Sequence, residues 1–429
     1  MKTFRALLSI VLTSAFAAPA LAQHEHHHEQ MEEGQQESAG LTLPHQREAS
    51  GTSWQPDSAP LYAHHFMAGD WMLMLHYAAE AGYDAQFGTR GSHRFLSINW
   101  VMGMASHPLL GGELTLRAMF SLEPATAAGP YATPLFLQSG ETYEGFALHD
   151  RQHPHDFFME TAAIWRRPLG QSLGLELYAA ASGEPALGPT AYMHRVSAMI
   201  NPFPPIGHHW QDATHIRFGV LTAGLYTRWL KLEGSIFHGM DPDEERWDFD
   251  FGPLDSWSAR ASVNPTPELS FQASYGFMHS MDRLAPGEDH RLISASGTWS
   301  KPWRTSGNLS ATAIFGHHMA SDHFSDSALL ETTADLDGLN VPFLRLEYVA
   351  KLGHDLVTPG AHDEKFPVLQ AQIGYVRRFP LGPVVPTIGI VLDVSLIPSS
   401  LEPLYDTRVP IGGFVFVGLQ PPPLRHSGM

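Results

Sequence analysis

The chain has 429 residues, a formal net charge of −18 and no cysteine. Such an acidic chain repels nucleic acid and anionic surfaces, so nucleic-acid binding is not expected. Without cysteine there is neither a disulfide framework nor a thiolate metal site. Any metal ligands must be nitrogen or oxygen atoms, or the thioethers of the 16 methionines.

The N-terminus has the pattern of an export signal. Lys2 and Arg5 precede an apolar run over residues 6–18, and an Ala-Leu-Ala sequence ends at Ala22. We therefore predict a signal peptide over residues 1–22. Its removal takes Lys2 and Arg5 away and changes the net charge from −18 to −20.

Residues 23–60 are predicted to form a disordered arm, because the segment is polar and poor in aromatic residues. Two interpretations are open for it: a weak scavenger of divalent metal, or a solvated leader. The front of the arm holds the histidines and carboxylates His24, Glu25, His26, His27, His28, Glu29, Glu32 and Glu33.

Residues 61–420 contain short segments in which apolar and polar residues alternate, separated by Gly, Pro, Asp and Asn clusters. In one of them Leu269, Phe271 and Ala273 oppose Ser270 and Gln272. This two-residue period is typical of strands with two different faces. The predicted strands, in chain order, are 71–79, 93–106, 112–122, 155–166, 172–181, 214–226, 228–238, 256–264, 268–279, 290–300, 307–317, 326–335, 342–351, 367–379, 384–396 and 409–419.

These features predict an all-β fold, an antiparallel transmembrane β-barrel of about 16 strands in the outer membrane of a Gram-negative bacterium. The segments have the length of about 9 to 11 residues that a tilted membrane strand needs, and tryptophans lie near several segment ends. After the signal, no apolar stretch reaches the length of about 18 residues that a transmembrane helix requires. A soluble β-sandwich or lectin is the alternative fold, and residues 421–429 are predicted to be a Pro-broken tail.

Two long segments, 123–151 and 183–212, lack alternation and are rich in Gly and Pro. We expect them to be inward or capping loops, because long loops without regular structure usually serve a function. Most of the histidines in the middle third of the chain lie in or beside these loops.

Imidazole is the commonest protein metal ligand, so the histidine-rich region predicts a site for a transition metal. The carboxylates of this region are expected to bind the metal or to orient the imidazoles that bind it. The same roles are expected for Glu160 on the adjoining strand. The alternative is that each histidine is hydrogen-bonded and holds the loops in place. The predicted metal ligands are His153, His155, Asp156, His194, His208, His209, Asp212, His215, His238 and Asp241.

A hydrolytic site is a further alternative. It would combine Ser139, Ser182, Ser197 or Ser256 with His194 or His238 and with Asp212 or Asp241. The chain has no Gly-x-Ser-x-Gly elbow. The acidic run that begins at Asp241 lacks the ligand spacing of a calcium loop and is interpreted as a solvated turn.

The chain contains several longer motifs, namely Phe120-Ser121-Leu122-Glu123-Pro124, Gln152-His153-Pro154-His155-Asp156-Phe157-Phe158-Met159-Glu160, Pro185-Ala186-Leu187-Gly188-Pro189, Tyr192-Met193-His194-Arg195, Gly207-His208-His209-Trp210-Gln211-Asp212-Ala213-Thr214-His215 and Asp255-Ser256-Trp257-Ser258. In these motifs the chain resembles a family of uncharacterised bacterial outer-membrane proteins that often accompany copper and other heavy-metal resistance systems. The resemblance spans roughly residues 64–350 and implies an exported β-barrel with a metal connection. It implies no established reaction or ligand set.

Taken together, the sequence predicts an outer-membrane barrel that binds or passes a transition metal ion. Copper is favoured because it heads the Irving–Williams order, and zinc or nickel are alternatives. The expected partners are outer-membrane lipid, the metal ion or a small solute, and periplasmic metal-handling proteins. A passive porin with a histidine-rich lumen and an outer-membrane lipase or esterase are the alternative functions.

Overall fold

The computed structural model describes residues 41–129, 132–212, 214–320 and 323–424. The predicted signal peptide, residues 23–40 of the predicted arm and the end of the predicted tail lie outside the described residues. No helix among the described residues is long and apolar enough to cross a membrane.

Most of the described chain is β-structure, with a few short helical turns. The helical turns are η1 (His45–Arg47), α2 (Glu123–Thr126), η2 (His208–Trp210), η3 (Ser399–Leu401) and α3 (Glu402–Tyr405). The strands are β1 (His64–Ala68), β2 (Trp71–Phe87), β3 (His93–Leu109), β4 (Gly112–Phe120), β5 (Thr133–Tyr143), β6 (Phe146–Gln152), β7 (Phe158–Pro168), β8 (Gly174–Gly183), β9 (Arg217–Tyr226), β10 (Leu230–Phe237), β11 (Ser256–Thr266), β12 (Leu269–Met278), β13 (His290–Trp303), β14 (Gly307–Ala320), β15 (His323–Asp335), β16 (Asn340–Leu352), β17 (Lys365–Arg378), β18 (Val385–Leu396) and β19 (Ile411–Gln420).

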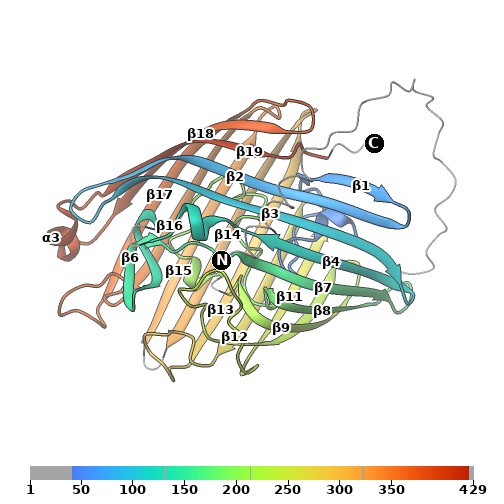
Figure 1. Ribbon diagram of the computed structural model, residues 1–429, viewed down its shortest axis with the longest axis horizontal. Helices are drawn as coiled ribbons and strands as arrows, with labels where there is room; N and C mark the ends of the chain where they lie inside the picture. The colour runs from blue at the N-terminus through green and yellow to red at the C-terminus, as the bar shows by residue number, and fades with distance from the viewer. Residues whose placement is uncertain (1–40, 130–131, 213, 321–322, 425–429) are drawn as a thin grey trace, which may run out of the picture. The chain divides into compact units, whose positions relative to one another are not determined.

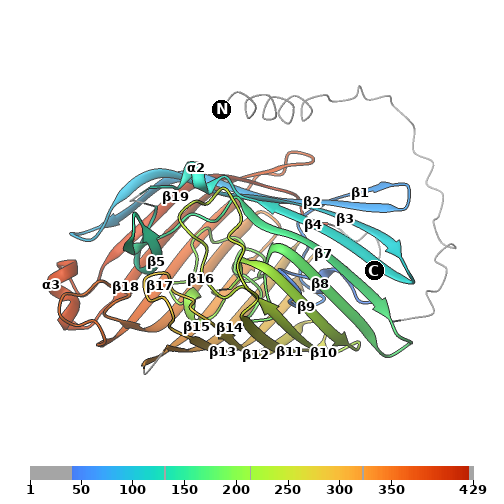
Figure 2. The ribbon, with the colours of Figure 1, turned by 60° about the horizontal axis from the view of Figure 1, so that its bottom comes forward.

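The main sheet closes on itself (Figures 1 and 2). Each of its strands pairs antiparallel with the next one along the chain, β4 pairs with β7 across the inserted β5–β6 hairpin, and β19 pairs with β2. The sheet has 17 strands, of which the short β1 pairs with the first residues of β2, and the other 16 strands form the closed ring. The predicted barrel is confirmed, and each of the predicted segments corresponds to one strand of the ring.

Alternation along the strands separates an apolar outer face from a polar inner face. On β10, Leu232 and Ile236 are exposed, whereas Lys231, Glu233 and Ser235 are buried. Such a pattern is required where one face of a strand meets lipid and the other faces the interior of a barrel.

The two ends of the barrel differ in the length of their connections. Turns such as 110–111, 267–268 and 304–306 join strands at one end, here called the short-turn end. The connections 184–216 and 353–364 lie at the opposite, long-loop end, where Figure 1 shows α3. In outer-membrane barrels the short turns face the periplasm and the long loops face the outside.

Residues 41–60 are ordered, so the prediction of a disordered arm is wrong for this part of the chain. The segment begins and ends at the short-turn end, where Leu41 N donates to Gly170 O at 3.1 Å and Ser58 N donates to Pro267 O at 3.0 Å. Between these points, Arg260 Nη2 donates to Thr52 Oγ1 at 3.0 Å. Polar composition did not prevent folding, because buried charged groups on the barrel wall supply hydrogen-bond partners that an isolated polar segment lacks.

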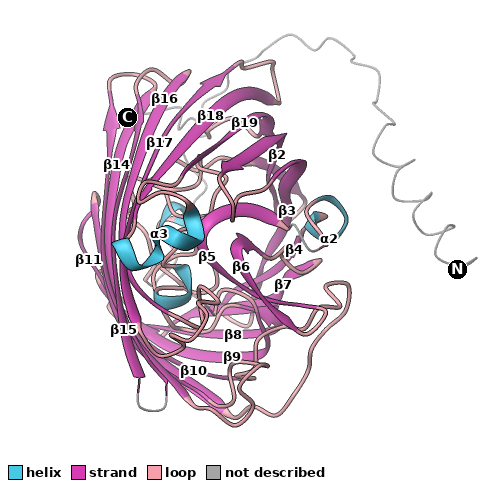
Figure 3. Cartoon of the chain, turned by 90° about the vertical axis from the view of Figure 1, so that its left-hand side faces the viewer, coloured by secondary structure: helices cyan, strands magenta, loops and turns pink. Residues whose placement is uncertain are grey.

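The two long segments were expected to be inward or capping loops. Figure 3 shows β5 and β6, from the first of them, within the ring of strands, whereas α2 lies outside it beside β3. Residues 123–151 are not an irregular loop: they contain α2 and the hairpin of β5 and β6. Alternation did not reveal this hairpin, because Leu135, Phe136 and Leu137 are all buried inside the barrel. The second segment, 184–216, is irregular apart from η2 and crosses the interior.

Candidate functional site

Buried ion pairs fasten the inner segment 184–216 to the barrel wall. Arg195 Nε lies 2.6 Å from Glu331 Oε1 on β15, and Arg345 on β16 approaches the same carboxylate at 3.1 Å. Arg345 also donates to Phe203 O at 2.7 Å. The charged inner face of β16 therefore has the paired partners that its sequence requires.

The turn η2 presents His208 and His209 to the long-loop end. Gly207, which precedes the turn, donates its backbone N–H to Glu347 Oε2 at 3.1 Å. Trp210 Nε1 donates to Ser325 Oγ at 2.8 Å. The turn lies so close to β14 that a Cβ atom on Gly316 would be 1.9 Å from Trp210 O. Glycine at this position therefore allows η2 to pack against the wall.

Three imidazoles, two of them buried and that of His215 half-buried, each have one ring nitrogen beside an oxygen acceptor. His155 Nδ1 lies 2.9 Å from Glu123 Oε2, and His208 Nδ1 lies 3.0 Å from Asp212 Oδ1. His215 Nδ1 lies 2.9 Å from Asp212 O. When these rings are neutral, the contacts favour the tautomer with the proton on Nδ1 and the lone pair on Nε2. The Nε2 atoms of all three are buried and have no hydrogen-bond partner among the described residues.

These histidines form a contiguous group, here called the plug cluster and defined as His153, His155, His208, His209 and His215. Ring centroids are 4.6 Å apart for His208 and His209, 5.0 Å for His208 and His215, and 5.6 Å for His155 and His215. His153 is 6.4 Å from His209. All of these histidines except His155 line a cavity of about 10 Å³, which is lined also by Asp156 and Asp241.

Burial and mutual repulsion keep part of the plug cluster neutral. Burial, together with the nearby His208, lowers the pKa of His215 to about 3. Burial and the Arg246 guanidinium hold the pKa of His153 well below its usual range. At His155 burial acts in the same direction, but the Glu123 carboxylate outweighs it and raises the pKa. Neutral imidazole is the form that binds a metal ion.

The other two predicted histidine ligands contact different groups. The His194 ring lies 4.9 Å from Trp100 and 5.7 Å from His76. His238 Nδ1 lies 3.0 Å from Pro253 O. These contacts do not test either residue as a ligand, so the role of both in metal binding stays a prediction.

The predicted carboxylates have cationic or imidazole partners. Asp156 pairs with Arg246 at 3.2 Å, and Asp241 pairs with Arg217. Asp212 orients His208, whereas Glu160 accepts hydrogen bonds from Arg117 at 2.9 Å and Tyr178 at 2.8 Å, so it belongs to a wall network. Asp212 therefore best fits the predicted role of an orienting group.

Within the described parts of the chain, one group of three ligand atoms lies within 4.8 Å of one another, and it is not the plug cluster. It consists of Asp243, Asp248 and Asp250 on the connection between β10 and β11. Asp248 is exposed, and Asp243 belongs to the acidic run that was interpreted as a solvated turn. Three ligand atoms of the plug cluster come into mutual reach only after side-chain rotation, and its role as a metal site stays a prediction.

Three of the four serines considered for hydrolysis have other partners, whereas Ser182 Oγ is buried without a hydrogen-bond partner among the described residues. Ser197 Oγ donates to Glu331 Oε1 at 2.8 Å, and Ser256 Oγ donates to Asp255 Oδ1 at 2.9 Å. Ser139 Oγ accepts from Lys351 Nζ at 3.1 Å. These contacts serve the packing of the inner segments and the long-loop end.

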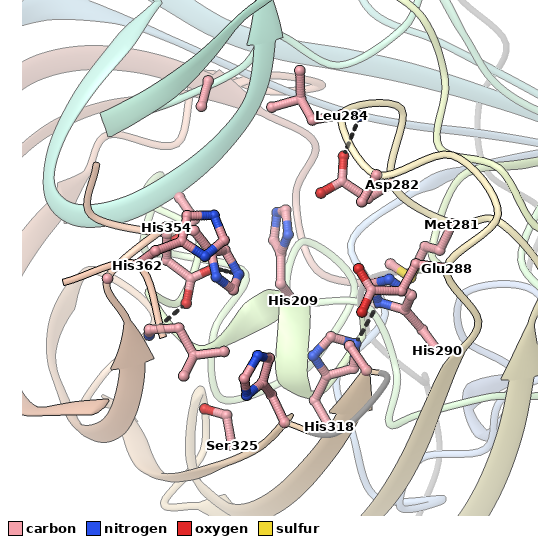
Figure 4. A pocket seen from close by; sticks show the side chains of 18 of the residues that line it. His209, Met281, Asp282, Leu284, Glu288, His290, His318, Ser325, His354 and His362 are labelled. Atoms are coloured by element: carbon pink, nitrogen blue, oxygen red, sulfur yellow. Dashed lines mark hydrogen bonds and ion pairs between the residues drawn. The ribbon is translucent and has the colours of Figure 1, made fainter. Parts of the chain in front are cut away.

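A second group of histidines, which sequence reasoning missed, lines a cavity of about 730 Å³ at the long-loop end (Figure 4). The positions of two of these histidines in the predicted strands could have indicated the group. His290 begins β13 and His318 lies near the end of β14, so the hairpin connection places both at one end of the barrel. The histidines that line this cavity are His209, His290, His318, His323, His354 and His362.

No family model matches the sequence, and no curated protein matches it. Among solved structures, the chain is similar to OmpF of Salmonella typhi in complex with daunomycin, with 10% sequence identity, coverage of 83% of this chain and 100% of that one, and a TM-score of 0.49. It is also similar to an anion-selective porin from Comamonas acidovorans, with 8% identity, 81% and 99% coverage and a TM-score of 0.48. The third similar structure is that of Pseudomonas putida OprB, with 11% sequence identity, coverage of 82% of this chain and 94% of that one, and a TM-score of 0.47. The fold assignment rests on the strand pairings of the chain itself, and the connection to metal resistance stays a prediction.

Proposed function

We propose that the protein is a porin-like barrel of the outer membrane that binds a transition metal ion, with copper favoured, at the plug cluster. The observation that carries the proposal is the arrangement of His155, His208 and His215. Each has its Nδ1 held by an oxygen and its buried Nε2 without a hydrogen-bond partner among the described residues. Ligand imidazoles in metal sites are oriented by acceptors in the same way.

The location follows from the outer face of the barrel. Residues that point outward, such as Leu225, Leu232 and Ile236, are exposed and apolar. An apolar band around a closed antiparallel barrel suits the hydrocarbon core of a membrane. Together with the predicted export signal, this band supports the outer membrane as the site of the protein.

Binding requires a modest rearrangement of side chains. The ring centroids of His208 and His215 are 5.0 Å apart, and those of His155 and His215 are 5.6 Å apart. Imidazole nitrogens bind metal at about 2.0 to 2.1 Å, so rotation of these rings towards the cavity is needed to bring the Nε2 atoms onto one ion. The cost of leaving the Nε2 atoms unpaired in a buried site favours such a rearrangement when metal is present.

The test is metal analysis of protein purified from outer membranes, with residues 23–40 deleted so that the predicted scavenging arm cannot contribute. We expect stoichiometric copper, lost in the variant His208→Ala with His215→Ala. Glu123→Gln is expected to weaken binding by about tenfold to 100-fold, because it removes the carboxylate that orients His155. His238→Ala, a histidine outside the cluster, is the control. Copper retained equally by the double variant would overturn the proposal.

A passive channel for small solutes is the second candidate. The closed ring of 16 strands and the cavity of about 730 Å³ at the long-loop end favour it. This function predicts swelling of proteoliposomes in small sugars or amino acids at a rate that is unchanged in the variant His208→Ala with His215→Ala. The inner segments that cross the barrel argue for a low rate.

A further inference from the structure

The cavity at the long-loop end, here called the mouth cavity, lies between the connections that follow β12 and β16 and is bordered by η2. Its lining carries the carboxylates of Asp282, Glu288 and Asp355 beside the single described cationic side chain of Arg283. The excess of negative charge favours the entry of cations. Its volume of about 730 Å³ is ample for a hydrated ion.

Two histidines on neighbouring strands form the first pair. His290 on β13 and His318 on β14 both project into the cavity, because Leu292 is paired with His318 and His290 lies two residues away on the same face. His290 Nδ1 lies 2.9 Å from His318 Nε2, and the ring centroids are 5.0 Å apart. His290 Nε2 is buried and has no hydrogen-bond partner among the described residues.

The second pair lies on the connection between β16 and β17. The ring centroids of His354 and His362 are 5.1 Å apart, and His354 N donates to His362 O at 3.0 Å, which holds the two residues together. His354 Nε2 lies 3.3 Å from Asp355 Oδ1, while His354 Nδ1 is buried without a hydrogen-bond partner in the described chain. A carboxylate on one ring nitrogen again leaves the other available.

His209 connects the mouth cavity to the plug cluster. Figure 4 shows His354 and His362 on one side of the cavity, His290 and His318 on the other, and His209 between them. His209 also lines the small cavity of the plug cluster, together with Asp241 and Met281, and both of these line the mouth cavity as well. The two cavities are therefore adjacent.

We propose that the mouth cavity is a second metal site, which captures divalent transition metal ions through the pairs His290–His318 and His354–His362. Each pair supplies two imidazole nitrogens, and carboxylates or water complete the coordination of the ion. Cu²⁺, Ni²⁺ and Zn²⁺ are the ions that imidazole ligands suit. This site goes beyond the proposed function and stands even where the plug cluster binds nothing, because it shares only His209 with that cluster.

The test is titration of the purified full-length protein and of protein lacking residues 23–40 with Cu²⁺, followed by electron paramagnetic resonance and calorimetry. We expect a population of Cu²⁺ with imidazole nitrogen ligands that persists in the variant His208→Ala with His215→Ala. In the fourfold variant His290→Asn, His318→Asn, His354→Asn and His362→Asn this population is lost, or its affinity falls by about tenfold or more. His107→Asn, at a half-buried histidine at the short-turn end, is the control.

Two outcomes separate this proposal from the preceding one. Loss of copper in the plug variant alone supports the plug cluster and overturns the mouth site. Loss of copper in the fourfold variant alone supports the mouth site and overturns the plug cluster as a metal site. Heat-modifiable migration on gels checks that each barrel has folded, and the loop pair His354→Asn with His362→Asn alone tests the site where the strand substitutions prevent folding. Unchanged copper affinity in that loop variant would also overturn the mouth site.

Discussion

Arg195 Nε and Glu331 Oε1 lie 2.6 Å apart, and both side chains are 1% exposed. The pair joins an inner segment to the barrel wall, and Arg345 shares the same carboxylate at 3.1 Å. With Asp212, whose Oδ2 lies 3.9 Å from Arg195 Nη1, the network holds two guanidinium groups and two carboxylates in a setting where an unpaired charge is costly. The segment that carries the plug cluster is therefore fixed to the strands that surround it.

Glu331→Gln is expected to destabilise the protein by about 3 to 5 kcal/mol, because it leaves the buried Arg195 and Arg345 without the charge that both contact. Unfolding by urea or guanidinium in detergent measures the loss. Glu402→Gln, at an exposed carboxylate on α3, is the control and should change stability little. Equal stabilities of the two variants would contradict this account of the network.

Gly316→Ala is expected to displace η2, since the added Cβ would lie 1.9 Å from Trp210 O. The backbone oxygen cannot move aside without shifting the turn, so we expect lower stability and weaker metal binding at the plug cluster. Gly103→Ala on β3 is the matched control, because nothing lies within 4 Å of a Cβ there. Metal affinity that is the same in both variants would show that the position of η2 does not matter.

Glu184→Gln is expected to stabilise the protein at neutral to alkaline pH. Burial raises the pKa of Glu184 to about 8, although the Arg260 guanidinium at 3.7 Å opposes this shift. A carboxyl whose pKa is raised on folding contributes stability that is complete below its unfolded pKa and is lost as the pH rises towards the folded value. Between those two values the wild type should lose up to about 1.4 kcal/mol per pH unit relative to the variant. Parallel stability curves from pH 4 to pH 9 would refute the prediction.

Deletion of residues 41–60 is expected to raise ion conductance in planar bilayers, because this segment lies across the barrel interior at the short-turn end. Its tip meets the second inner segment, where Ser53 Oγ and Thr190 Oγ1 are 3.0 Å apart. Deletion of residues 23–40 serves as the control and should leave conductance unchanged. Low conductance in both deletions would mean that residues 184–216 and the β5–β6 hairpin are enough to close the passage.

The ring of strands was predictable from the sequence, because a strand with lipid on one side and a polar interior on the other repeats every two residues. Such alternation is local, as on β12 from Leu269 to Met278. The predicted end of β2 was inaccurate, because the strand continues to Phe87, well past the predicted end at residue 79. Its later part is rich in alanine and glycine, so the apolar contrast between its two faces is small.

The sequence by itself determined the class of fold and the region in which the histidines of the plug cluster lie, and it left open whether the two long segments fold inward or cap the barrel. Only the tertiary structure decided that residues 41–60 are ordered, that the second long segment crosses the interior, and that His290 and His318 face His354 and His362 across a cavity. The two-residue period of a strand can be recognised from residues that are adjacent in the sequence. These contacts, in contrast, join segments that become neighbours only when the sheet closes. Ring closure brings distant connections to one end of the barrel, and no local pattern records that juxtaposition.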